Sequence, residues 1–172
     1  MGAREMMARA NPSFALRPYI ADDTSVLADI FRASIEGLAS EDYSQSQVDA
    51  WAGAVEDEDA FEERLGASLA LVATMEGSPV GFASLDKPDH IDFLYVHPAV
   101  AGKGVGTMLI DAFEKLANAR GVKKLTVEAS DNAQEFFRHR GFKAMQRNSV
   151  PLGGEWFANT TMEKPLAAKA AQ

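Results

Sequence analysis

The sequence contains no cysteine among its 172 residues. This absence excludes disulfide bonds, thiolate metal sites and every mechanism that uses a cysteine nucleophile. There are only three histidines and none has the spacing His-x-x-x-His, so we expect no bound metal. No stretch reaches the roughly 18 apolar residues of a membrane-spanning helix. Residues 1–11 also lack the apolar run of a secretory signal, and we therefore expect a cytoplasmic protein.

Basic residues are outnumbered in this chain. Its 17 Lys and Arg against 25 Asp and Glu give a formal net charge of −8 at pH 7. Such an acidic chain does not favour binding to a nucleic-acid backbone or to an anionic membrane, so neither partner is expected. The composition is otherwise that of a globular protein, with 47% hydrophobic and 24% charged residues. We predict one domain over residues 12–166, between tails at residues 1–11 and 167–172.

Hydrophobic periodicity divides the predicted domain into short segments. Helical spacing, with caps before and glycines after, predicts helices around residues 23–35, 44–51, 61–66, 105–120 and 133–140. Alternation predicts strands around residues 14–17, 68–74, 80–85, 91–96, 125–129, 142–150 and 156–163. A hairpin followed by strand–helix–strand–helix–strand predicts a single α/β (α+β) domain. Its mixed sheet would have about six to seven strands and helices on both faces.

The strongest chemical pattern follows the strand that ends at Pro98. Glycines alternate at Gly102, Gly104 and Gly106, and a helix begins there. Alternating glycines let backbone N–H groups converge, and the helix N-terminus adds a partial positive charge. The loop therefore suits a phosphate or pyrophosphate, and Lys103 adds a mobile positive charge.

Two common phosphate-loop patterns do not fit this loop. A Walker A loop ends in Gly-Lys-Ser/Thr, whereas Lys103 lies between two glycines. A dinucleotide-binding fingerprint has the spacing Gly-x-Gly-x-x-Gly, whereas this loop has Gly-x-Gly-x-Gly. On the sequence alone, a tight turn whose glycines serve only to avoid steric clashes remains an alternative interpretation of this loop.

Residues Ala101–Gly106 resemble the acetyl-CoA-binding motif of the GNAT superfamily of N-acetyltransferases. The stretch Asn132–Phe142 is similar to a second motif of that family, an asparagine followed by a short helix and Gly-Phe. Residues 43–52 and 154–159 resemble small bacterial members of uncertain substrate, the YafP-like group. The resemblance covers residues 14–166. It implies a GNAT-like fold and transfer of the acetyl group of acetyl-CoA to a primary amine of a small molecule or peptide, by a monomer or homodimer.

The resemblance also implies which residues bind acetyl-CoA. The loop backbone would hold the pyrophosphate, and the strand before it would pair with the pantetheine arm. The asparagine and the helix after it would contact the rest of the CoA. These three groups are, in order, Ala101, Gly102, Lys103, Gly104, Val105, Gly106 and Thr107; Leu94, Tyr95 and Val96; and Asn132, Phe136, His139 and Arg140.

Two positions depart from the family pattern. Ala101 stands where the family often has Arg or Gln, a loss that matters little if the loop binds through its backbone. Phe137 stands where the family often has a tyrosine that protonates the leaving thiolate, and phenylalanine donates no proton. A thiol pKa of about 8.5 still makes the thiolate a fair leaving group. An acid from elsewhere, or water, is the alternative.

Because there is no cysteine, an acetyl-cysteine intermediate is impossible, and direct attack in a ternary complex is predicted. A backbone N–H near Tyr95 or Val96 would polarise the thioester carbonyl. Two carboxylates, Asp92 and Glu128, lie inside apolar strands. We predict that one of them holds the ammonium group and the other takes its proton. The alternative is a structural role, in which each carboxylate faces solvent or pairs with Arg or Lys.

Strand alternation makes a specific prediction about the face on which Asp92 lies. It places Asp92 on the same face as Leu94 and Val96. The opposite face would then hold Ile91, Phe93 and Tyr95.

Tyr43, Gln47 and Trp51 recur every four residues and form one stripe of a predicted helix. Such a stripe serves either core packing or the lining of an acceptor pocket. Trp156 and Asn159, near the last strands, are further candidates for substrate binding. The alternatives to this enzyme are a catalytically weak acetyl-CoA-binding sensor or interaction module, and a transferase that uses another acyl-CoA.

Overall fold

The computed structural model describes residues 13–38 and 41–167 of the chain. Its helices are η1 (Ala21–Asp23), α2 (Thr24–Leu38), α3 (Gln45–Ala52), η2 (Gly53–Val55), α4 (Glu58–Gly66), η3 (Pro98–Val100), α5 (Val105–Ala119) and α6 (Gln134–His139). Its strands are β1 (Phe14–Pro18), β2 (Leu69–Met75), β3 (Ser78–Lys87), β4 (His90–Val96), β5 (Lys124–Ser130), β6 (Lys143–Leu152) and β7 (Glu155–Pro165). The predicted tail at residues 1–11, and residues 168–172 of the other predicted tail, lie outside the described residues.

Local sequence signals set several of these boundaries. The Ser44 hydroxyl accepts from the Gln47 N–H, and the Gln47 side chain accepts from the Ser44 N–H, so the predicted capping box opens α3. Gly121, with φ of 75°, follows the end of α5, as the sequence predicts. Among the described residues, no helix combines the length and apolar character that crossing a membrane requires.

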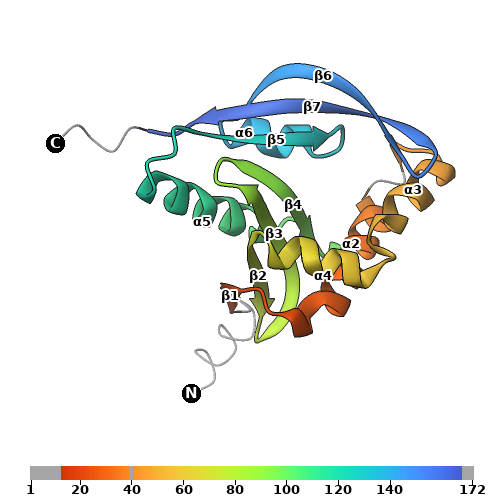
Figure 1. Ribbon diagram of the computed structural model, residues 1–172, viewed down its shortest axis with the longest axis horizontal. Coiled ribbons are helices and arrows are strands. Elements are labelled where there is room, and N and C mark those ends of the chain that lie inside the picture. The colour runs from red at the N-terminus through yellow and green to blue at the C-terminus, as the bar shows by residue number, and fades with distance from the viewer. Residues whose placement is uncertain (1–12, 39–40, 168–172) are drawn as a thin grey trace, which may run out of the picture.

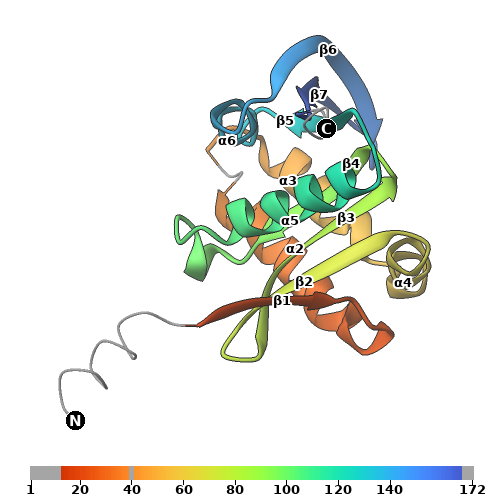
Figure 2. The same ribbon diagram turned by 90° about the vertical axis from the view of Figure 1, so that its left-hand side faces the viewer.

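The seven strands form one mixed sheet in the order β1-β2-β3-β4-β5-β7-β6. All neighbours are antiparallel except β4 and β5, which are parallel and joined through α5. One hydrophobic cluster lies between the sheet and α2, α3 and α4, and another lies beneath α5 and α6. Figure 2 shows α5 on one side of the sheet and α2 on the other. The predicted mixed sheet with helices on both faces is confirmed.

The pairing of β4 with β5 is short. It consists of His90 opposite Thr126 and Ile91 opposite Val127. Beyond this point the two strands are not paired, and the sheet divides into one arm of β1–β4 and another of β5, β7 and β6 (Figure 1). The facing edges of β4 and β5 therefore leave backbone groups without a partner strand.

A β-bulge interrupts β4 next to this division. Ser84 of β3 pairs with Phe93, but Leu85 pairs with Ile91, so Asp92 is an extra residue in β4. The buried Ser84 hydroxyl accepts a hydrogen bond from the Phe93 N–H, at 3.2 Å. A side chain thus supplies the acceptor that the interrupted ladder does not.

The bulge makes the predicted alternation of β4 wrong. Ile91 packs in the α5-side cluster with Leu94 and Val96, whereas Phe93 and Tyr95 pack in the α2-side cluster. The Asp92 carboxylate reaches Arg64 of α4, which also lies on the α2 side. One inserted residue shifts the period-two pattern by one position, and alternation alone does not reveal the insertion.

We expect Ser84→Ala to lower the free energy of unfolding by about 1–3 kcal/mol, because the buried Phe93 N–H loses its acceptor. Urea unfolding followed by circular dichroism measures this change. Ser149→Ala is the matched control, since Ser149 is exposed on edge strand β6, and we expect it to change stability by less than about 0.5 kcal/mol. Equal effects of the two substitutions would show that Ser84 does not support the bulge.

Candidate active site

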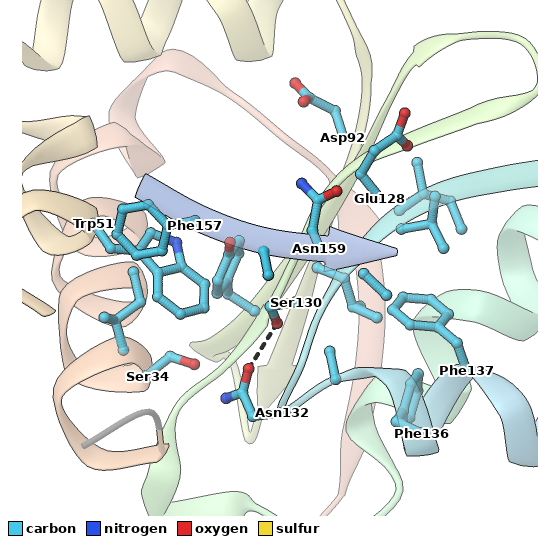
Figure 3. Close-up of a pocket in the computed structure, with 18 of the residues that line it drawn as sticks. Ser34, Trp51, Asp92, Glu128, Ser130, Asn132, Phe136, Phe137, Phe157 and Asn159 are labelled. Carbon is cyan, nitrogen blue, oxygen red and sulfur yellow. Dashed lines mark hydrogen bonds between the residues drawn. The ribbon is translucent and has the colours of Figure 1, made fainter. Parts of the chain in front are cut away.

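A cavity of about 360 Å³ lies where β4 and β5 diverge (Figure 3). Its walls come from α2, α3, both diverging strands, α6 and the β6–β7 hairpin. Predicted catalytic, cofactor-binding and substrate-binding residues all line it. In that order they are Asp92 and Glu128; Leu94, Tyr95, Val96, Gly106, Asn132 and Phe136; and Tyr43 and Trp51. The topology of the sheet therefore brings together side chains that are far apart in the sequence.

Asp92 and Glu128 lie at the end of the cavity where the strands separate. Each is the first residue beyond the last β4–β5 pair, and Figure 3 shows the two carboxylates near one another. Among the described lining residues they are the only charged side chains. This part of the cavity thus carries negative charge without a lining cation and is suited to a positively charged group.

Arg64 of α4 holds the Asp92 carboxylate. Its Nε and Nη2 donate to the two Asp92 oxygens at 2.8 and 2.5 Å, and its guanidinium lies 4.5 Å from the centroid of the Phe93 ring. The Asp92 side chain is 9% exposed and that of Arg64 is 58% exposed. Asp92 therefore pairs with arginine, as the structural alternative predicts, and also lines the cavity.

Glu128 has a different partner, His90. The imidazole Nε2 lies 2.9 Å from Glu128 Oε2, and its Nδ1 lies 2.6 Å from Asp86 Oδ1. Burial lowers the pKa of His90, but the hydrogen bonds to the two carboxylates outweigh it and raise that pKa above its ordinary value. His90 was not predicted as a site residue, because its partners come from strands whose register the sequence does not reveal.

The unpaired edge of β4 offers backbone groups to the cavity. The His97 N–H donates to Val80 of β3 at 2.8 Å, and the Phe93 N–H also points toward β3. Because successive residues of a strand point their backbone groups in opposite directions, Leu94 and Val96 direct theirs toward β5. The Tyr95 N–H points toward β3 for the same reason, so the candidates for polarising a carbonyl are the N–H groups of Leu94 and Val96.

The glycine loop continues from β4 through η3 to α5. Gly102 and Gly104 have φ values of 77° and 87°, a conformation that favours glycine. Gly104 is the N-cap residue of α5 and no side chain caps this end, so the first-turn N–H groups have no partner within the helix. Residues 101–104 are exposed, which makes these groups accessible to an anion.

Arg140 connects α6 to the first turn of α5. Its Nε donates to Thr107 Oγ1 at 2.9 Å, its Nη1 donates to the Phe136 carbonyl at 3.1 Å, and its guanidinium lies 4.0 Å from the centroid of the Phe136 ring. A Cβ on Gly106 would lie 3.1 Å from that ring, so any other residue here would require the ring to shift by a few tenths of an ångström. His139 stands apart, with an exposed side chain 3.4 Å from Glu135.

Aromatic side chains form the opposite wall. The Tyr43 hydroxyl accepts from the Asp131 N–H at 3.1 Å, and the Tyr43 ring contacts those of Trp51 and Phe157, with centroids 5.3 and 6.1 Å away. Burial raises the pKa of Tyr43, and raises the pKa of Tyr95 to about 12. Both phenols therefore remain protonated near neutral pH.

Two predicted substrate residues lie outside the cavity lining. Gln47 donates from Nε2 to the Trp156 carbonyl at 2.8 Å, and Trp156 is 64% exposed. Their contact joins α3 to β7 and so supports the wall that carries Trp51. Several lining residues were not predicted from the sequence, because only the tertiary packing brings them here: Ser34, Ile35, Ser130, Val150, Leu152 and Phe157. Asn159 does line the cavity.

Comparison with known proteins agrees with this geometry. Residues 39–166 match the family described as "Acetyltransferase (GNAT) domain". The chain belongs to the GNAT acetyltransferase family. It is also 35% identical over 147 residues to the uncharacterized N-acetyltransferase YafP of Escherichia coli K12, covering 86% of this chain and 93% of that protein. The chain is therefore an acetyl-CoA-dependent acyltransferase, as its motifs predict.

Solved structures of GNAT proteins have the same fold. A GCN5-related N-acetyltransferase from Rhodopseudomonas palustris superimposes with a TM-score of 0.87 and is 60% identical, covering 91% of this chain and 96% of that one. The PaiA N-acetyltransferase of Thermoplasma acidophilum, in complex with coenzyme A, has a TM-score of 0.75 and is 19% identical, covering 89% of this chain and 99% of that one.

The glycine loop generates a test of cofactor binding. Gly104 and Gly77 both have φ of 87° and open space where a Cβ would lie, so alanine at either site should cost about 1–2 kcal/mol of stability. Only Gly104→Ala should also weaken acetyl-CoA binding, by about tenfold or about 1.4 kcal/mol. Gly77 lies in the β2–β3 turn, outside the loop.

Isothermal titration calorimetry with acetyl-CoA measures the affinity, and urea unfolding measures the stability. Equal affinity in the two glycine variants would remove the loop from cofactor binding.

Proposed function

We propose that this acetyltransferase transfers the acetyl group of acetyl-CoA directly to a primary amine of a small molecule or peptide, within a ternary complex. The observation that carries the proposal is the position of Asp92 and Glu128, one on each side of the point where β4 and β5 separate. A bound thioester in this gap would lie beside two carboxylates. Such a pair suits an acceptor that arrives as an ammonium ion and reacts as an amine.

The cofactor half of the proposal rests on unpaired backbone groups. The pantetheine arm would enter the gap and pair with Leu94 and Val96 as an added strand does. The pyrophosphate would accept hydrogen bonds from the N–H groups of Gly102 and residues 104–107. The Lys103 N–H donates to the Val100 carbonyl, and the Lys103 side chain would add positive charge. Asn132 and Phe136, which line the cavity, would contact the arm on its other side.

The two carboxylates take different roles. Both Asp92 oxygens accept from Arg64, so Asp92 is a fixed anion that attracts the ammonium group. Glu128 uses only Oε2 in its hydrogen bond to His90, and Oε1 is available to accept the proton, directly or through a water molecule. The free amine then attacks the thioester carbon.

Attack forms the N–C bond, and collapse of the tetrahedral intermediate breaks the C–S bond. The N–H of Leu94 or Val96 stabilises the oxyanion in between. The nitrogen of the intermediate releases its second proton to water as the C–S bond breaks. Phe137 is buried against Phe136 and Phe142 and donates no proton, so the sulfur leaves as a thiolate and takes up a proton from water. The absence of cysteine removes any acetyl-enzyme route through sulfur.

Separate substitutions of the two carboxylates test these roles. We expect Glu128→Gln to lower kcat by about 100-fold, because proton removal is lost. We expect Asp92→Asn chiefly to raise KM for the amine, because Arg64 then places an uncompensated positive charge beside the cavity. Both variants should keep the Kd for acetyl-CoA within about twofold. Glu163→Gln on neighbouring β7, whose partner is Lys124, is the control.

Thiol release from acetyl-CoA measures turnover over a panel of polyamines, aminoglycosides, amino acids and peptides. The chain has no cysteine, so the enzyme adds no thiol background. Binding of acetyl-CoA without turnover of any amine would instead identify a binding module. Turnover only with a longer acyl-CoA would identify a different donor.

A further inference from the structure

We propose that His90 is a positioning residue for Glu128, an inference that rests on the amine acetylation proposed above. Asp86 of β3, His90 of β4 and Glu128 of β5 form a continuous hydrogen-bonded chain across three strands. His90 lies at the first of the two paired positions of β4 and β5, directly before the cavity. This series of hydrogen bonds therefore ends at Glu128, the carboxylate to which we assign proton removal.

Glu128 depends on this contact for its orientation. Its side chain is 45% exposed, and among the described residues His90 is its only hydrogen-bond partner. An exposed glutamate has several accessible rotamers, and one fixed oxygen selects among them. With Oε2 held by His90, the other oxygen is left for the acceptor amine.

The geometry also defines the protonation state of His90. Each ring nitrogen faces a carboxylate oxygen, and a neutral imidazole has only one N–H. With both carboxylates ionised, only the imidazolium donates to both. Its raised pKa agrees with this state.

The charged groups that act on the His90 ring are Asp86 from β3 and Glu128 from β5. Lys87 at the end of β3 and Asp89 on the β3–β4 turn make no hydrogen bond to the ring among the described residues. On β4 itself, the Asp92 carboxylate is bound to Arg64. The charge of His90 is therefore balanced by the same two carboxylates that it connects.

This arrangement makes the positioning of Glu128 by His90 depend on pH. Below its raised pKa, His90 is doubly protonated and holds Glu128. As pH rises through that pKa, the ring loses one proton and can keep only one of its two hydrogen bonds. We therefore expect kcat to fall on the alkaline side with the pKa of His90.

The test compares kcat against pH for the whole enzyme and two substitutions, with the best acceptor from the amine panel. His90→Ala should lower kcat near neutral pH by about tenfold, equivalent to about 1.4 kcal/mol of transition-state stabilisation. Its Kd for acetyl-CoA should stay within about twofold. His90→Gln, whose amide donates to Glu128 without carrying charge, should restore most of kcat and remove the alkaline fall. Glu163→Gln should leave both kcat and its pH profile unchanged.

A double-mutant cycle separates positioning from a general structural effect. If His90 acts through Glu128, His90→Ala should change kcat by less than about twofold in a Glu128→Gln background. If His90→Ala lowered kcat equally in the wild-type and Glu128→Gln backgrounds, the inference would be overturned. A His90→Ala variant with the kcat of the wild-type enzyme at every pH would also overturn it. If the alanine variant does not fold, an unchanged alkaline limb in His90→Gln would overturn it. Failure of the wild-type enzyme to release thiol with every amine would contradict the proposed function instead.

Discussion

The short parallel contact between β4 and β5 is the constraint on which the rest of the structure depends. Two residue pairs join the arms of the sheet, and the strands then separate because the bulge at Asp92 redirects β4. Further pairing would close the cavity and satisfy the backbone edge to which we assign the cofactor. The cost of this opening is limited, because Ser84 satisfies the N–H at the bulge and helices cover both faces of the sheet.

The same opening reconciles an acidic protein with a polyanionic co-substrate. The net charge is −8, and the two charged side chains of the described cavity lining are carboxylates. Attraction for a pyrophosphate would come instead from the N–H groups at the N-terminus of α5. The arginines near the cavity form hydrogen bonds to neighbouring protein groups: Arg64 to Asp92, and Arg140 to Thr107 and the Phe136 carbonyl. The N-terminus of α5 and the carboxylates Asp92 and Glu128 thus offer opposite charges at separate places, to which we assign the cofactor and the amine.

Much of the fold could be predicted because its signals are local. Capping at Ser44, the turn between the apolar strands β2 and β3, and the glycines before α5 each depend on a few neighbouring residues. The face of Asp92 could not be predicted, because a one-residue bulge leaves no mark in the alternation. His90 was missed for another reason: its partners Asp86 and Glu128 meet it only through strand register. The predicted cytoplasmic location, tails and oligomeric state stay predictions.

The unpaired edge of β4 has a consequence for the lifetime of the enzyme. A ligand that completes the sheet binds the folded chain and not the unfolded one, so acetyl-CoA at 100 times its Kd adds about 2.7 kcal/mol to the stability of the fold. In the proposed binding mode, loss of the ligand would uncover the edge of β4, the kind of surface at which chains aggregate. The supply of acetyl-CoA in the cell would therefore govern how long each molecule persists, as well as how fast it works.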